Sequence, residues 1–188
     1  MKKNRIFTRS HRILHWITAA VMLILLFTGF LHEFWMSKHG IADMIRNSIG
    51  QQYLSDKHAV NIATQIRDPM WNWHVYMAYT IVIVFSIRII YMLIKGIRFP
   101  NPFKKKLYLK DRIEGFSYIL FYFLVLINIV TGFYHLWGPH NALRHNLGTI
   151  HKLAIYWFPT FLLFHFVGVV IGEIKHKKGI VSKIIGGD

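Results

Sequence analysis

The sequence contains no cysteine and few charged residues. The lack of cysteine excludes disulfides, thiolate metal sites, iron–sulfur clusters and covalently attached c-type haem. Charged residues make up 16% of the 188 residues, against roughly 25% in soluble domains. Hydrophobic residues make up 54% and aromatic residues 16%, which excludes a disordered chain because such chains are poor in both. This composition argues against a soluble domain.

The apolar residues gather into four long runs, at about 13–31, 73–94, 116–137 and 150–171. Each run is close to the ~20 residues that cross a ~30 Å hydrocarbon core as a helix. We therefore predict an all-α fold, an integral membrane four-helix bundle that forms one transmembrane domain over residues 1–188. No small-residue cleavage site follows the first run, so we expect it to be a retained helix and not a signal peptide.

The net charge of +15 is unevenly placed along the chain. An even number of spans puts both termini on one side, and seventeen of the 23 Lys and Arg residues fall on that side. They lie in the first twelve residues, at Arg88, in 95–112 and after residue 174. Short basic loops stay in the cytoplasm, so both termini are predicted to be cytoplasmic in a bacterial inner membrane. The charge thus indicates orientation and contact with anionic lipid, and not nucleic-acid binding.

A long connection, residues 32–70, follows the first span on the outer side. Within it Ile41, Met44, Ile45 and Ile49 recur at near-helical spacing. Two interpretations stay open for this stretch, an interfacial helix and an irregular loop.

Four of the 12 histidines fall in the spans or at their ends: His15, His74, His151 and His165. Polar residues are costly in a membrane and indicate function there. Fourteen residues separate His151 from His165, which advances about 21 Å along a helix and comes within about 40° of four full turns. Both rings should leave one helix face near opposite membrane surfaces. A shared zinc ion would instead need a spacing of three or four residues.

The direction in which each span crosses the membrane predicts which histidines lie at the same level. The first span enters from inside, which puts His15 at the inner level with His165. The second enters from outside, which puts His74 at the outer level with His151. Two bis-histidine pairs predict two noncovalent haems b, with one pair of axial ligands at each iron. The alternatives are His11 in place of His15 and His135 in place of His74.

The same fourteen-residue step marks three further positions. It leads from His15 to Gly29 and from Tyr118 to Gly132, where a glycine at the outer level would leave room for a porphyrin. It also leads from His74 to Arg88. Arg88 is predicted to pair with an inner haem propionate, the alternative being a side chain that extends to lipid headgroups. Thr28-Gly29 and Thr131-Gly132 also form a short internal repeat, which weakly indicates equivalent packing positions.

These residues resemble the bacterial di-haem cytochrome b561 and nickel–iron hydrogenase cytochrome b family. The resemblance runs from about residue 7 to 175, and the ligand plan is similar to that of the formate dehydrogenase gamma subunit. The residues that carry it are Arg12-x-x-His15-Trp16, Thr28-Gly29, His74, His151 and His165. The resemblance implies electron transfer between the quinone pool and a redox partner, with a quinone as substrate near one membrane face. Candidate inner-face groups are His11, Arg88, Asn101 and Tyr108.

The leading hypothesis is a di-haem b-type cytochrome that carries electrons across the membrane and exchanges them with quinone. One role that stays open for it is the membrane subunit of a periplasmic-facing hydrogenase or dehydrogenase, with 32–70 in the docking surface. A stand-alone quinol-linked oxidoreductase, for example one acting on superoxide, is the alternative, and a homodimer is left open. A proton or ion transporter is less favoured, because the spans carry almost no buried acidic or amide residue apart from Asn128. The wide spacing of His151 and His165 argues against a non-haem metal transporter.

Overall fold

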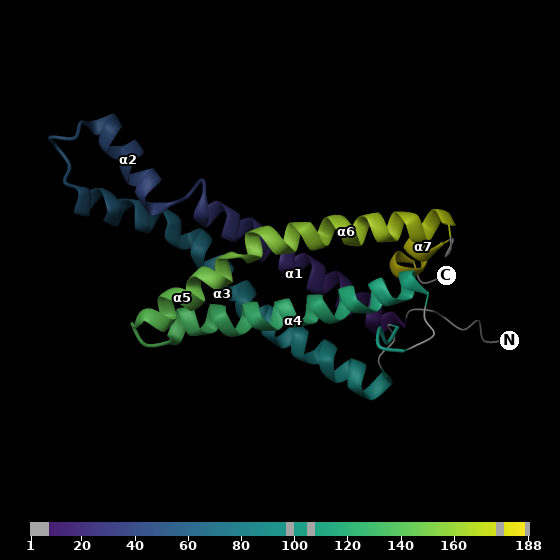
Figure 1. Cartoon of the computed structure of the whole chain (residues 1–188). Coiled ribbons are helices and arrows are strands. Elements are labelled where there is room, and N and C mark those ends of the chain that lie inside the picture. Colours follow the sequence, from purple (N-terminus) through teal and green to yellow (C-terminus); the bar gives the residue numbers. More distant parts are fainter. Residues whose placement is uncertain (1–7, 97–99, 105–107, 176–178, 187–188) are drawn as a thin grey trace. The chain divides into compact units, whose positions relative to one another are not determined.

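The computed structural model describes residues 8–96, 100–104, 108–175 and 179–186, which contain helices and no strand. Figure 1 shows the helices in chain order. Their bounds are α1 Arg9–Glu33, α2 Lys38–Ile49, α3 Asp56–Lys95, α4 Leu109–Trp137, α5 Ala142–Lys152, α6 Ala154–Lys175 and α7 Ile180–Ile185. The predicted all-α fold is confirmed.

Four segments are long and apolar enough to cross a membrane: α1, α3, α4, and α5 together with α6 over Ala142–Ile174. The chain is therefore a multi-pass membrane protein, as predicted. Four crossings would return the chain to the side on which it began, and both this arrangement and the cytoplasmic placement of that side stay predictions. Several of its basic residues, with His176, lie outside the described residues: Lys2, Lys3, Arg5, Arg98, Lys105, Lys106, Lys177 and Lys178.

The chain divides into two compact units, and each is described by itself. One unit contains Met1–His15 with Val84–Asp188, and the other contains Trp16–Ile83. Both α1 and α3 therefore contribute to each unit.

In the unit Trp16–Ile83, α2 and the first part of α3 pack together as a helical hairpin. Its core contains Ile41 and Ala42 from α2 and the fully buried Ala59 and Ala63 from α3. Alanines at i and i+4 lie on one face, and their small size lets the helices approach closely. Arg46 of α2 forms an ion pair with Asp56 at the start of α3, which links the two helices beside their connecting turn.

The stretch 32–70 is consequently mostly helical, so residues 41–49 form a helix and not an irregular loop. The apolar side of this helix packs on α3, and its position at the membrane interface stays a prediction. The helix that contains the second span begins earlier than the predicted span, at Asp56 instead of residue 73. At 1.5 Å per residue a helix of 40 residues is about 60 Å long, twice the thickness of the ~30 Å hydrocarbon core. The polar first part of α3 is therefore predicted to continue outside the membrane.

In the other unit, α5 runs back beside α4 after a short turn (Figure 1). Arg144 holds this turn together. Its Nε donates to the carbonyl of His135 at 2.7 Å and its Nη1 to that of Gly138 at 3.3 Å. These carbonyls lie at the end of α4, where they lack partners within the helix.

The predicted fourth helix, 150–171, is divided at Leu153. There the amides of Leu153 and Tyr156 donate to carbonyls three residues earlier, at 3.1 and 3.0 Å. Pro159 follows within α6, and a proline ring disturbs the preceding helical turn because it lacks an N–H and crowds the carbonyl four residues back. The step from His151 to His165 therefore crosses a tightened turn, and the two residues do not lie on one regular helix as predicted.

Candidate functional site

The structure brings His15 of α1 and His165 of α6 together. Their ring centres lie 6.2 Å apart and their planes are tilted by 41°. An imidazole nitrogen binds a metal ion at about 2 Å and the ring centre lies about 1 Å further, so two axial imidazoles place their centres about 6 Å apart. The spacing of His15 and His165 therefore fits one iron held between the two rings.

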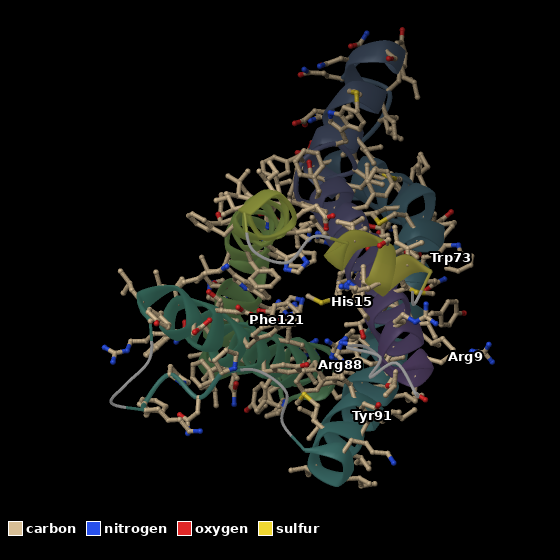
Figure 2. The ribbon with its side chains drawn as sticks, turned by 90° about the vertical axis from the view of Figure 1, so that its right-hand side faces the viewer. Arg9, His15, Trp73, Arg88, Tyr91 and Phe121 are labelled. Atoms are coloured by element: carbon tan, nitrogen blue, oxygen red, sulfur yellow. The ribbon has the colours of Figure 1, made fainter. Side chains whose placement is uncertain are left out.

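Aromatic side chains stack on the His165 side of this histidine pair. Phe161 stacks on His165 with ring centres 5.8 Å apart, and Phe121 stacks on Phe161 at 4.4 Å. Figure 2 shows His15, Arg88 and Phe121 gathered in one region. An apolar shell of this kind limits the access of water and so influences the redox properties of a bound metal.

Arg88 lies beside the same pair and is held by α4. Its Nε donates to the hydroxyl of Tyr122 at 2.6 Å, and its guanidinium carbon lies 5.8 Å from the centre of that ring. The Arg88 charge also acts electrostatically on His15. A cation within a span needs a protein partner or a route to the interface, and Tyr122 is such a partner. The propionate pairing of Arg88 stays a prediction.

His74 belongs to the unit Trp16–Ile83, where the Thr28-Gly29 pair receives its ring. The Nδ1 atom lies 2.8 Å from the hydroxyl oxygen of Thr28. A Cβ added at Gly29 would lie 3.8 Å from Cε1 of His74, an ordinary contact. Trp71, one turn earlier in α3, stacks on the ring at 5.1 Å with the two planes almost parallel, at 5°. The His74 ring is thus fixed from two sides.

His151, at the end of α5, is received by the second Thr-Gly pair. Its Nδ1 donates to the main-chain carbonyl of Asn128 at 3.0 Å. A Cβ added at Gly132 would lie 2.7 Å from Cε1 and 2.9 Å from Nδ1 of His151, closer than real Cβ contacts. Gly132 therefore makes room for the imidazole itself. The pairing of His74 with His151 joins the two units and stays a prediction.

The two alternative ligands, His11 and His135, make contacts with nearby parts of the chain. The amide of His11 donates to the hydroxyl oxygen of Thr8 at 3.2 Å, a contact that caps the start of α1. His135 packs against Gly148, and its Nδ1 lies 3.4 Å from the carbonyl of Arg144. The ring contacts of His135 favour a structural role for it, whereas the contact of His11 involves only its main-chain amide, so its ring stays an alternative to that of His15.

Two of the four candidate inner-face groups are turn and surface residues. The Oδ1 atom of Asn101 accepts a hydrogen bond from the amide of Phe103 at 3.1 Å. Tyr108 precedes α4 and is 84% exposed. Of the four, Arg88 is brought to the histidine pair from another helix, and His11 lies one turn before His15 in α1.

The comparisons with known proteins agree with this geometry. The family described as prokaryotic cytochrome b561 matches residues 6–187. The chain belongs to the prokaryotic cytochrome b561 family. As a cytochrome b561 it is a membrane protein that binds b-type haem and transfers electrons. No curated protein and no solved structure matches the chain.

Three contacts of this cytochrome b561 were missed from the sequence. They involve Thr28, Tyr122 and the carbonyl of Asn128. The first had a signal, because Thr28 stands beside Gly29 in the repeated pair. The second also had one, since an arginine in a span calls for a partner. The third had none, because any residue could supply a main-chain carbonyl.

Proposed function

We propose that this cytochrome b561 holds two haems b and transfers electrons across the bacterial inner membrane, between the quinone pool and a redox partner on the outer side. The spacing of 6.2 Å between the ring centres of His15 and His165 carries the proposal. These two residues would be the axial ligands of the inner haem. The haem, when bound, supplies one-electron redox chemistry.

His74 and His151 would ligate the outer haem, a pairing that rests on the topology of the spans. Supporting it, the Nδ1 atom of each ring is already engaged, by Thr28 and by the carbonyl of Asn128. A metal-binding histidine commonly donates its other ring N–H to such an acceptor, which fixes the tautomer and the ring orientation. The Nε2 atoms are then the ones that can bind iron.

Other residues would tune the inner site. The Arg88 cation, oriented by Tyr122, would offset the negative charge of a haem propionate. Phe121 and Phe161 would exclude water. Quinone would react at the inner face, where Arg88 is the strongest of the four candidate groups.

The hairpin of α2 and the first part of α3 would meet the redox partner. It is long enough to extend past the outer membrane surface and has its own apolar core. A helical projection is a more defined docking surface than an irregular loop. This favours a membrane subunit of a periplasmic-facing hydrogenase or dehydrogenase over a stand-alone quinol-linked oxidoreductase.

A reduced-minus-oxidised absorption spectrum tests the proposal, combined with extraction of haem measured against protein. We expect a b-type alpha band and two haems per chain. A colourless preparation would contradict the haem sites altogether, and a ratio near one would mean that one histidine pair is wrong. Copurification from native membranes then separates the two oxidoreductase roles, since a membrane subunit should bring its outer-side partner with it.

A further inference from the structure

The hydroxyl of Thr28 takes part in a short chain of hydrogen bonds that ends on His74. Thr28 is 5% exposed, deep within its unit. Its Oγ1 donates to the carbonyl of Ile24 at 2.7 Å and lies 3.1 Å from that of Leu25. The same oxygen lies 2.8 Å from Nδ1 of His74.

These distances decide where the imidazole proton is. A threonine hydroxyl has one proton to donate and can also accept. If that proton points to the carbonyl of Ile24, the hydroxyl must accept from His74, so Nδ1 carries the hydrogen and both short contacts are hydrogen bonds. In the opposite arrangement the hydroxyl donates to Nδ1, the contact to Ile24 loses its hydrogen, and Nε2 is protonated. Among the contacts of Thr28, the first arrangement makes one more hydrogen bond, and in it Nε2 carries no hydrogen.

We propose that Thr28 is a positioning residue that fixes the tautomer and orientation of His74 and lowers the midpoint potential of the haem bound there. This rests on the proposed function, in which His74 is an axial ligand. An acceptor on Nδ1–H makes the imidazole a stronger donor to the metal, and a stronger axial donor stabilises the oxidised iron. The bond from Thr28 to Ile24 polarises the hydroxyl and strengthens its acceptance from His74.

The second Thr-Gly pair supplies a matched control. Thr131 is 4% exposed and donates to the carbonyl of Ile127 at 2.7 Å, as Thr28 does to that of Ile24. Its other close contact is the carbonyl of Asn128 at 3.3 Å, so among the described residues this hydroxyl bonds only within its own helix. His151 uses the carbonyl of Asn128 in place of a hydroxyl. Replacing Thr131 removes an equivalent buried hydroxyl without touching a histidine proton.

The experiment is a spectroscopic redox titration of the full-length, haem-loaded protein. Thr28→Val keeps the shape and removes the hydroxyl, and Thr28→Ser keeps the hydroxyl. We expect a higher midpoint for one haem in Thr28→Val, a near-native midpoint in Thr28→Ser, and native midpoints in Thr131→Val. Unchanged midpoints in Thr28→Val at full haem content would overturn the proposal, as would an equal rise in Thr131→Val.

Loss of haem in Thr28→Val is also decisive when Thr28→Ala is measured beside it. If both variants lose one haem and Thr28→Ser retains two, the hydroxyl holds the ring and the proposal stands. If Thr28→Ser loses it as well, a hydroxyl at this position does not suffice to hold the ring and the proposal fails. His74→Ala tests the underlying function separately: one haem should be lost, and two retained haems would refute the ligand assignment itself.

Discussion

The two glycines of the Thr-Gly pairs should respond differently to the same substitution. In Gly132→Ala the new Cβ would lie 2.7 Å from Cε1 and 2.9 Å from Nδ1 of His151. In Gly29→Ala it would lie 3.8 Å from Cε1 of His74. The first distance requires the ring to move, and the second is an ordinary contact. Gly29→Ala is therefore the matched control for Gly132→Ala.

The cost of Gly132→Ala can be worked from these contacts. Overpacking of this kind costs about 1–3 kcal/mol. A displaced ring also weakens the bond from His151 to the carbonyl of Asn128, a loss of about 1 kcal/mol. Since about 1.4 kcal/mol is a factor of ten, the affinity of the outer site for haem should fall roughly ten- to a thousandfold. Gly29→Ala should bind haem as the native protein does.

The assay is haem content per chain as haem is removed by a competing haem-binding protein, followed by the difference spectrum. We expect Gly132→Ala to lose one haem early and Gly29→Ala to keep both. The interpretation from sequence, in which both glycines leave room for a porphyrin, predicts equal losses. Equal behaviour of the two variants would therefore refute the reasoning from the structure.

Three further predictions follow from the described contacts. His15→Ala and His74→Ala should each lower the haem content from two to one but remove different haems, and loss of the same haem would contradict the inferred topology. Arg88→Gln should lower the midpoint potential of the inner haem in a redox titration, because a nearby positive charge stabilises the added electron; an unchanged midpoint would leave Arg88 as a membrane anchor. Arg144→Ala should lower the free energy of unfolding by about 1–3 kcal/mol, since it leaves carbonyls at the end of α4 without donors. An unaltered melting temperature would contradict that role.

The four apolar spans could be predicted from the sequence, but the helical segment that precedes the second span could not. Hydropathy finds the apolar half of α3 and stops near Trp73, because Asp56–Met70 is too polar for a membrane helix. That part is helical since Ala59 and Ala63 pack against α2, a tertiary contact that hydropathy cannot detect. The division at Leu153 had no signal in the sequence, because Pro159 acts on the carbonyl of Ile155, four positions earlier, and not on that of Leu153.

For the site, the sequence indicated the candidate ligands but not the contacts that surround them. Histidines in apolar spans stand out because of their cost, and His15 and His165 do lie at a spacing that fits one iron. The surroundings depend on which rotamer and which neighbouring helix each ring meets. Spacing alone placed Gly132 at the outer level, but only the packing of α5 on α4 shows that His151 occupies the space where its Cβ would be.

The repeated Thr-Gly pair has a similar structural role in the two helices that contain it. In α1 and in α4 the glycine opens a helix face, and a histidine from another helix lies against it. The difference lies in the acceptor of the Nδ1 proton. At His74 it is a side-chain hydroxyl, which a single substitution can remove, and at His151 it is a main-chain carbonyl, which none can. Substitution in α1 can therefore tune the electronic character of His74 directly, whereas in α4 the same kind of change can act on His151 only through the shape of the space around its ring.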